Sequence, residues 1–184
     1  MKIPATIEEK LLLYRVRVNQ DEQAFATLYD RYVEAIYRFC FFKLSNKEEA
    51  QDITSETFIK VWQYLINTEH LEVQNVKSLI YSIARNNIID LYRSRSRRPE
   101  LPLDESIDVV AATDVVETMN QSQDHERMLG LLKKLKQEYQ EVVMLRYIED
   151  FSIGDIADIL GKTNTTIRVT LHRAVKKLQT LSEL

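Results

Sequence analysis

The pattern of hydrophobic and polar positions is sharpest near the C-terminus, where it predicts a short helix over residues 153–160. Its apolar positions, at the i, i+3, i+4, i+7 spacing of an amphipathic helix, are Ile153, Ile156, Ala157 and Leu160. Ser152 occupies the N-cap position, and Asp155 lies near the positive end of the helix dipole. Gly161 follows, where a left-handed residue ends many helices. The sequence therefore marks both ends of this helix and its buried face.

A second helix is expected directly after that turn, capped by Thr163 or Asn164. Its apolar face consists of Ile167, Leu171, Ala174, Val175 and Leu178. The other faces carry Thr165, Thr166, Arg168, His172, Arg173, Lys176 and Lys177, and no acidic residue occurs over residues 160–181. Two short helices joined by a tight turn, the second basic outside, are typical of a DNA-reading helix-turn-helix. The alternative is an ordinary helical hairpin with a solvated basic face.

The N-terminal part of the chain also follows helical spacing. Asp21 is expected to cap a helix that runs to about Leu44, after a short apolar and basic segment over residues 6–18. The core stripe of that helix is Phe25, Leu28, Tyr29, Tyr32, Val33, Ile36 and Cys40. Residues 45–48 read Ser-Asn-Lys-Glu, the S-x-x-E form of a capping box, and so predict the start of another helix at Ser45.

The helix after this capping box has two different faces. One face is expected to be buried and carries Ala50, Ile53, Thr57, Val61, Trp62 and Leu65. The other is a mixed polar face with Asp52, Ser55, Glu56, Ile59, Lys60 and Gln63. A partner protein could bind such a face.

A further helix begins near Val76 and ends in a basic run. Its inward positions are Leu79, Ile80, Ile83, Ala84, Ile88 and Leu91. The polar groups are Arg85, Asn86, Asn87, Arg93, Arg95, Arg97 and Arg98, interleaved with Tyr81 and Tyr92. Guanidinium groups for the backbone, aromatic rings for stacking and amides for base edges suit single-stranded nucleic acid. Arginine-rich helix ends also occur on plain solvated surfaces, which is the alternative here.

Composition and charge divide the chain. With three glycines and three prolines in 184 residues, an all-α fold is expected. Residues 99–126 hold eight acidic and no basic residues, so the rest has 25 bases against 28 − 8 = 20 acids and a net charge of +5, although the whole chain carries −3. Pro99 and Pro102 open this segment. We therefore expect two small helical domains, 1–98 and 124–184, joined by a flexible acidic linker over 99–123.

The second domain begins before the helix-turn-helix. Helical spacing resumes after Asp124, and a further helix is expected over residues 141–149. The positions that carry the resumed spacing are Met128, Leu131, Leu132, Leu135 and Tyr139.

Several functional classes are not indicated. No apolar run is long enough for a membrane span, and no export signal is visible, so a cytoplasmic protein is expected. The lone Cys40, in an apolar run, reads as a buried hydrophobe. His70, His125 and His172 lack metal-ligand spacing, and neither a nucleophile–base set nor a phosphate loop appears, so no metal, cofactor or enzyme activity is expected. The enzyme alternative would use Asp52 and Glu56 to bind Mg²⁺ in a nucleic-acid-processing reaction.

Four stretches carry a family resemblance. Residues 50–62, A-Q-D-I-T-S-E-T-F-I-K-V-W, resemble the core-polymerase-binding helix of bacterial sigma factors, and residues 79–93, L-I-Y-S-I-A-R-N-N-I-I-D-L-Y-R, resemble the promoter-melting helix that follows it. Residues 139–161 and 166–174 resemble the C-terminal promoter-reading domain. Two domains in this order with no third between them resemble the extracytoplasmic-function (ECF) sigma factors of RNA polymerase.

The resemblance implies a role for each candidate residue. Core polymerase would be bound by Asp52, Ser55, Glu56, Phe58 and Ile59. The −10 promoter element would be bound by the loop 67–76 and by Arg85, Asn86, Asn87, Arg93, Arg95, Arg97 and Arg98, with Asn86 reading a flipped base. The −35 element would be bound by Thr165, Thr166, Arg168, Val169, Thr170, His172, Arg173, Lys176 and Lys177.

The resemblance also implies partners, and it has departures. Core RNA polymerase, promoter DNA and an anti-sigma factor, which could hold the protein at the membrane, are the implied partners. Val169 and Thr170 stand where family members often have Ser-Arg, which predicts an unusual −35 preference because valine can touch a thymine methyl. The alternative is a free-standing helix-turn-helix regulator whose N-terminal domain senses a ligand or dimerises. The polar face over 50–63 favours polymerase docking over that alternative.

Overall fold

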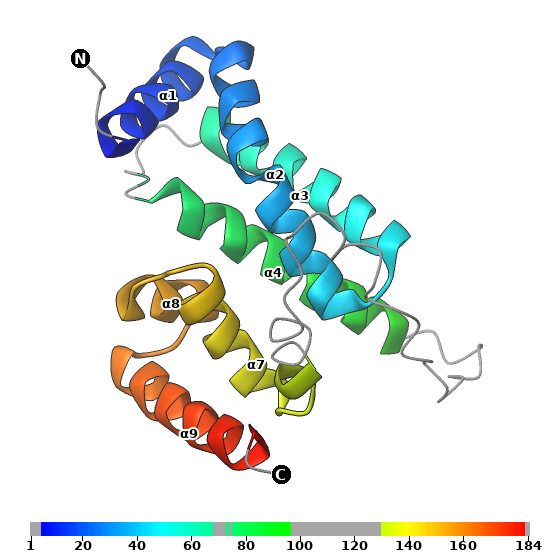
Figure 1. Ribbon diagram of the computed structural model, residues 1–184. Helices are drawn as coiled ribbons and strands as arrows, with labels where there is room; N and C mark the ends of the chain where they lie inside the picture. The colour runs from blue at the N-terminus through cyan, green and yellow to red at the C-terminus, as the bar shows by residue number, and fades with distance from the viewer. Residues whose placement is uncertain (1–4, 68–72, 74, 97–129, 183–184) are drawn as a thin grey trace. The chain divides into compact units, whose positions relative to one another are not determined.

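The computed structural model describes residues 5–67, 73, 75–96 and 130–182, and the regular structure in these ranges is helical (Figure 1). The chain divides into two compact units, Met1–Ser106 and Ile107–Leu184. The all-α prediction is confirmed. The linker expected over 99–123 lies outside the described residues, as do Arg97, Arg98 and most of the loop 67–76.

The first unit is built from α1 (Ala5–Asn19), α2 (Glu22–Leu44), α3 (Lys47–Asn67) and α4 (Val76–Ser96). In Figure 1, α2, α3 and α4 lie against one another, and α1 packs on α2 and α3. Fully buried side chains from all of these helices form the core: Val16, Leu28, Ile36, Phe39, Leu65, Ile80, Tyr81 and Ile88. Phe39 and Tyr81 meet edge to face, with ring centroids 5.2 Å apart. The predicted apolar stripes therefore converge on a single core in this unit.

The start of α2 is capped as predicted. One carboxylate oxygen of Asp21 accepts hydrogen bonds from the backbone N–H groups of Gln23 and Ala24, each at 3.0 Å. Arg15 adds an ion pair to the same carboxylate at 2.7 Å. The backbone N–H of Ala24 and the Arg15 guanidinium hold the pKa of Asp21 below its usual value. The cap thus also joins the end of α1 to the start of α2.

The capping box predicted at Ser45 is wrong. Ser45 has a left-handed backbone (φ 52°) and ends α2, donating its N–H to the Phe41 carbonyl at 2.8 Å. Asn46 is the N-cap of α3 instead, because its side-chain oxygen accepts the N–H of Glu49 at 3.0 Å. The two helices follow so closely that one residue must end the first and the next must begin the second.

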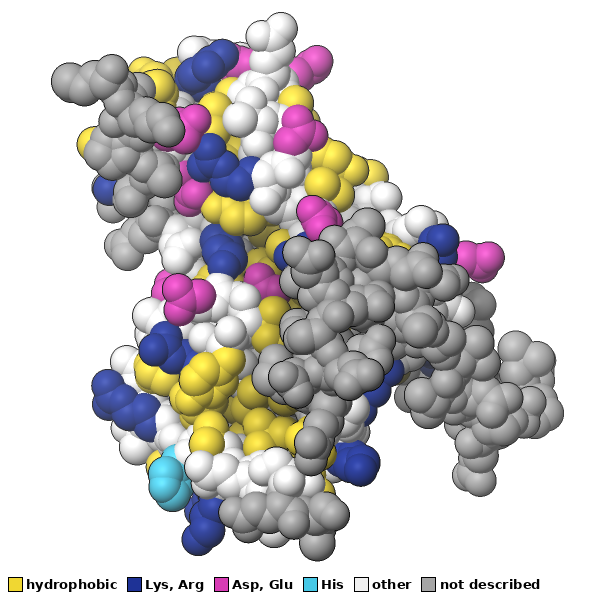
Figure 2. Space-filling view, viewed as in Figure 1, with side chains coloured by type: hydrophobic (Ala, Val, Ile, Leu, Met, Phe, Trp, Pro, Cys, Tyr) yellow, Lys and Arg dark blue, Asp and Glu magenta, His cyan; other side chains and the backbone are white. Residues whose placement is uncertain are grey.

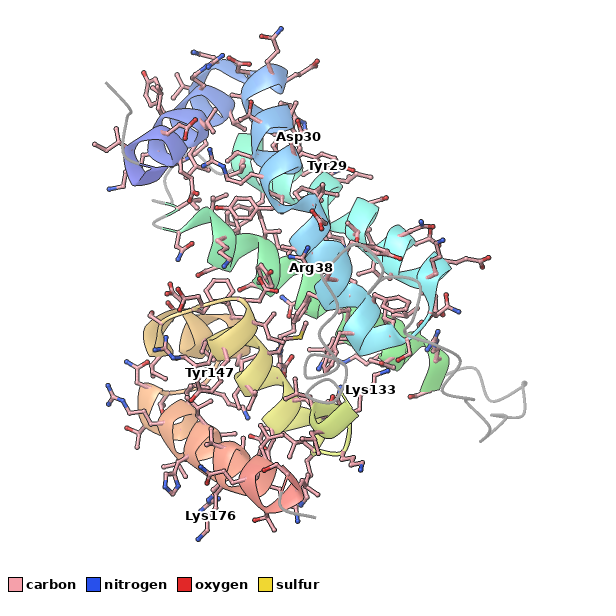
Figure 3. All side chains as sticks on the ribbon, viewed as in Figure 1. Tyr29, Asp30, Arg38, Lys133, Tyr147 and Lys176 are labelled. Carbon is pink, nitrogen blue, oxygen red and sulfur yellow. The ribbon has the colours of Figure 1, made fainter. Side chains whose placement is uncertain are left out.

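Two tyrosines of the first unit differ from the predicted pattern. Tyr29 (Figure 3), expected in the core stripe of α2, is exposed, and its ring covers that of the buried Phe58. Tyr81, expected among the nucleic-acid-binding groups, is fully buried. Cys40 is buried as predicted, and burial raises the pKa of its thiol to about 11.

The second unit contains α7 (Gln137–Val143), the π-helix η1 (Met144–Ile148), α8 (Ile153–Leu160) and α9 (Asn164–Ser182). Both α7 and α8 pack against α9. The fully buried side chains Leu132, Leu145, Ile156 and Ile167 form the core of this unit. Within the described ranges, no helix is long and apolar enough to cross a membrane.

The helical spacing predicted to run unbroken to Tyr139 is interrupted. The chain turns at Lys134–Leu135, where backbone N–H groups donate three residues back, and α7 starts at Gln137. The side-chain amide of Gln140 donates to the carbonyls of Lys133 and Leu135, at 3.2 and 2.9 Å, and so satisfies acceptors that the turn leaves open. The helix expected over 141–149 is consequently the second half of a longer one, whose last turn is a π-helix.

Candidate functional site

The helix-turn-helix of the second unit is fixed by its caps. Ser152 accepts the N–H of Asp155 at 3.1 Å, and the Asp155 carboxylate accepts the N–H of Ser152 at 3.2 Å, a reciprocal capping box at the start of α8. Gly161 ends α8 with φ 62°. Thr163 then caps α9 by accepting the N–H of Thr166 at 3.2 Å. The caps at Ser152, Gly161 and Thr163 were predicted, with Asn164 as the alternative to Thr163, whereas the return bond from Ser152 N–H to Asp155 was not.

The entry into α8 is fixed as well. Asp150 has a left-handed backbone (φ 54°), and the Phe151 N–H donates to the Leu145 carbonyl at 3.0 Å. Arg146 of the π-helix donates to the Phe151 carbonyl at 2.7 Å, and the Phe151 side chain is buried. The backbone N–H and carbonyl of Phe151 are therefore both bonded to the π-helix, which holds the angle between the π-helix and α8.

Helix α9 separates its reading positions from its core positions. The exposed residues are Thr165, Thr166, Arg168, Val169, His172, Arg173, Lys176 and Lys177. Figure 2 shows dark blue Lys and Arg side chains on this part of the surface, and Lys176 points outward from α9 in Figure 3. Ile167 and Ala174 are fully buried. Because α9 carries no acidic residue, its outer face can approach a polyanion without like-charge repulsion.

Two positions of α9 bear on the expected −35 reading. Thr170 is only 7% exposed and packs in the core, so the prediction that it contacts DNA is wrong. Thr170 lies three residues after Ile167 and four before Ala174, which places all three on the buried face. Val169 is 44% exposed, so its methyl groups are available to a partner surface.

The polar face of α3 is exposed as predicted. Asp52, Ser55, Glu56 and Ile59 all point to solvent, and Ile59 is the most apolar of them. Phe58 does not belong to this face: it is 4% exposed, and its ring packs edge to face on Tyr29 with centroids 4.7 Å apart. Phe58 follows Thr57, another buried position, so the buried arc of α3 is wider than the apolar pattern indicated.

A polar network ties this face of α3 to α4. Glu56 pairs with Lys60 at 2.7 Å, and Lys60 Nζ also donates to Asn87 Oδ1 at 2.6 Å. Asn87 Nδ2 donates to Thr57 Oγ1 at 3.1 Å, and Thr57 Oγ1 donates to the Ile53 carbonyl at 2.6 Å. Asn87 is 4% exposed and so cannot contact DNA directly, which corrects its placement in the −10 set. A buried amide must find partners, and these meet that requirement.

The end of α4 is held by a side chain of α3 and a backbone carbonyl of α2. Arg95 forms an ion pair with Glu49 of α3 and lies over the ring of Tyr92, and the Tyr92 hydroxyl donates to the Lys43 carbonyl at 2.7 Å. Burial raises the pKa of Tyr92, so its hydroxyl remains a donor at neutral pH. Sequence reasoning missed Glu49, because no local signal links it to a residue 46 positions further along the chain.

The remaining residues of the expected −10 set lie on the outer side of α4. Asn86 is exposed, Arg85 is half-buried, and Arg93 is exposed and pairs with Asp90 at 3.3 Å. Asn86 and Arg93 are therefore accessible to a nucleic acid, although Arg93 pairs with Asp90 of its own helix, whereas the carboxylate partner of Arg95 comes from α3. Across the described part of the chain, no group of three or more His, Cys, Asp or Glu is arranged to hold a metal ion.

Comparisons with known proteins place these two units in a class. Residues 28–98 match the family model of Sigma-70 region 2, and residues 125–178 match the model of Sigma-70, region 4. Each match falls within one of the two compact units. The chain therefore combines two domains of the sigma-70 class, in the order expected from the sequence.

Relatives narrow the class to a family. The chain is 30% identical over 171 residues to the ECF RNA polymerase sigma factor SigL of Mycobacterium tuberculosis, with 85% of this chain and 88% of SigL covered. It is 28% identical to the ECF RNA polymerase sigma factor SigW of Bacillus subtilis, over 91% of this chain and 96% of SigW. The match to the ECF RNA polymerase sigma factor BldN of Streptomyces coelicolor, 29% identical over 88% of this chain, spans 61% of BldN. The protein belongs to the ECF sigma factors of RNA polymerase.

Solved structures share the fold. The sigma factor RpoE, in complex with the anti-sigma factor NepR from Bartonella quintana, gives a TM-score of 0.72 at 24% identity, over 87% of this chain and 97% of that one. CnrH, in complex with the cytosolic domain of CnrY, gives a TM-score of 0.64 at 19% identity, over 97% and 96% of the two chains.

Proposed function

We propose that the protein binds core RNA polymerase through the exposed face of α3 and directs it to promoters with a −10 and a −35 element. The first unit would read the −10 element with Asn86 and neighbouring groups of α4, and the second would read the −35 element with the outer face of α9. The protein carries out no chemistry of its own in this proposal, and it needs no metal or cofactor. Its place of action is the cytoplasm, where polymerase and DNA meet.

The observation that carries the proposal is the segregation of charge on exposed faces. On α3, the carboxylates of Asp52 and Glu56 stand one helical turn apart beside Ile59, a combination suited to a basic protein surface with an apolar centre. On α9, the exposed face is cationic and polar without any acid. One face thus suits a protein partner and the other a nucleic acid, as a polymerase specificity subunit requires.

An anti-sigma factor is a further partner in the proposal. Support comes from RpoE, whose structure was solved in complex with the anti-sigma factor NepR and whose fold this chain shares. Family membership supports the same partner class. Such a protein would compete with polymerase or DNA for the exposed faces, and a membrane-bound one would hold the sigma factor at the membrane.

Binding to purified core polymerase tests the docking face. The wild-type chain is expected to bind stoichiometrically, and Asp52→Arg with Glu56→Arg is expected to abolish binding because both changes place cations against a basic partner. The matched control is Asp30→Arg with Glu34→Arg, which reverses two exposed carboxylates at the same four-residue spacing on α2 (Figure 3). Polymerase binding by the control pair should remain at the wild-type level.

Promoter selection tests the second half of the proposal. Holoenzyme made with this chain should recover DNA with two conserved elements from a random pool. If the wild type bound duplex DNA but not core polymerase, the proposal would fail and a free-standing regulator would take its place.

A further inference from the structure

We infer that Lys60 is a positioning residue that couples the polymerase-docking face of α3 to the promoter-reading helix α4. This inference rests on the proposed function, and it assigns Lys60 a role beyond being one more cation on a polar face. The geometry that carries it is the sharing of one ammonium group between exposed Glu56, at 2.7 Å, and buried Asn87, at 2.6 Å.

Asn87 is held in a single orientation by this network. Its side-chain oxygen accepts from Lys60, and its nitrogen donates to Thr57 at 3.1 Å. Since the amide is 4% exposed, water cannot readily replace either partner. Both partners come from α3, so they fix the rotation and height of α4 against α3 at the position of Asn87.

That position matters because Asn86 is the next residue. Asn86 is exposed, and it is the candidate reader of the flipped base. A rotation of α4 that disengages Asn87 would carry Asn86 with it. Nearer the C-terminal end of α4, Arg95 pairs with Glu49, and the Tyr92 hydroxyl donates to the Lys43 carbonyl. Helix α4 is thus tied at its end by these residues and near its middle by Lys60.

The tie near the middle of α4 responds to what Glu56 binds. Glu56 and Lys60 are both exposed and four residues apart, a spacing that lets them pair on one side of α3. When a cationic group of polymerase takes Glu56, it weakens the pull of Glu56 on Lys60 and repels the ammonium group. Both effects drive the ammonium toward Asn87. Docking therefore tightens the hold on α4, and the reader is positioned when polymerase is bound.

Substitution of Lys60 separates this role from a merely structural one. Lys60→Met keeps the aliphatic stem and removes the shared donor. Promoter opening, followed by a fluorescent base analogue in the −10 element of a selected promoter, should fall by about tenfold, as expected when a charge-assisted hydrogen bond is lost. Affinity for core polymerase should rise by about two- to threefold, because a cation is removed from a face that meets basic groups. General destabilisation would lower both quantities.

Three further variants complete the experiment. Lys60→Arg, which can still reach both partners, should restore both quantities to near the wild-type values. Asn87→Leu should reduce promoter opening as much as Lys60→Met does. Opening by the double variant should be no lower than opening by the more impaired single variant, because both substitutions remove one contact. Arg38→Met is the matched control, since Arg38 forms an i, i+4 pair with Glu34 at 2.8 Å on α2.

The outcomes distinguish this inference from the proposed function. Failure of the wild type to bind polymerase would overturn the proposed function itself. Normal binding with opening unchanged in Lys60→Met and in Asn87→Leu would overturn only the coupling. A parallel loss of binding and opening that Lys60→Arg does not rescue would also overturn it, because that result describes a residue needed only for folding.

Discussion

Gly161 and Gly154 lie in the same helix-turn-helix, and the structure predicts opposite effects when each is replaced by alanine. Gly161 has φ 62°, and a Cβ there would meet no atom within 4 Å. Gly161→Ala therefore destabilises the fold only through the backbone conformation that alanine has to adopt. Holding alanine in the left-handed region destabilises the folded state by about 1–2 kcal/mol. Alanine also lowers the conformational entropy of the unfolded chain, which offsets about 0.4–1 kcal/mol of this loss. The expected net loss of stability in the second unit therefore lies between about 0 and 1.6 kcal/mol, with a central value of about 0.8 kcal/mol.

Gly154 is the control for this prediction. It lies in the first turn of α8, and its added Cβ would sit 3.6 Å from Ser152 Oγ, an ordinary van der Waals contact. Alanine is a better helix former than glycine by about 0.5–1 kcal/mol, so Gly154→Ala should stabilise the second unit. The gain in stability should lie near the lower end of this range, because Gly154 is close to the helix end. The two substitutions add the same methyl group and differ only in backbone conformation.

Urea titration of the full chain, followed through the NMR amide signals of Ile156 and Ile167, reports the second unit alone. Gly161→Ala should move their midpoint to lower urea and Gly154→Ala to higher urea, while signals from α2 stay unchanged. Gly161→Asn should lose less than the alanine variant, because asparagine tolerates the left-handed region. A shift of both alanine variants in the same direction would refute the reasoning.

Three other outcomes are expected. Ile167→Ala, at a fully buried site, should destabilise the second unit by about 2–5 kcal/mol and leave the thermal transition of Trp62 fluorescence in the first unit unchanged. Val169→Ser should lower the affinity of holoenzyme for its selected −35 element and relax the preference for thymine, measured by competition with single-base variants; unaltered selectivity would count against contact with a methyl group. Burial raises the Cys40 pKa from 9.0 to about 11, so the neutral thiol should stabilise the fold below about pH 9 and lose this contribution as pH rises toward 11. Alkaline unfolding of Cys40→Ala, which lacks this titration, should be less steep.

Local signals predicted the local structure well. Asp21, Ser152 and Gly161 were assigned correctly because a cap depends on a few consecutive residues. Ser45 was assigned wrongly because the same short stretch also offered Asn46, and the choice between them depends on where the previous helix ends. The π-helix over Met144–Ile148 was not predicted, because its residues follow the same apolar pattern as an α-helix.

Long-range contacts explain what the pattern missed at the candidate site. Asn87 and Thr170 are polar residues on buried faces, and the hydrogen-bond partners of Asn87 lie on α3. Phe58 was expected at the polymerase contact because of the family resemblance, but it is buried, and its ring packs on Tyr29 of α2. A period of about 3.6 residues predicts which side of a helix faces inward. The width of the buried side depends on residues of other helices that pack against it, and the pattern within one helix does not show these.

The division of α9 into a buried and an exposed side has an evolutionary consequence. Its exposed positions, such as Arg168 and Val169, lie on another face than the fully buried Ile167 and Ala174, and the turn before α9 is fixed by Gly161 and Thr163. Substitutions on the outer side away from the cap are therefore expected to change stability by only about 0.5 kcal/mol each. Duplicated genes of this kind can diverge to control new sets of genes by single steps, each of which leaves a folded protein.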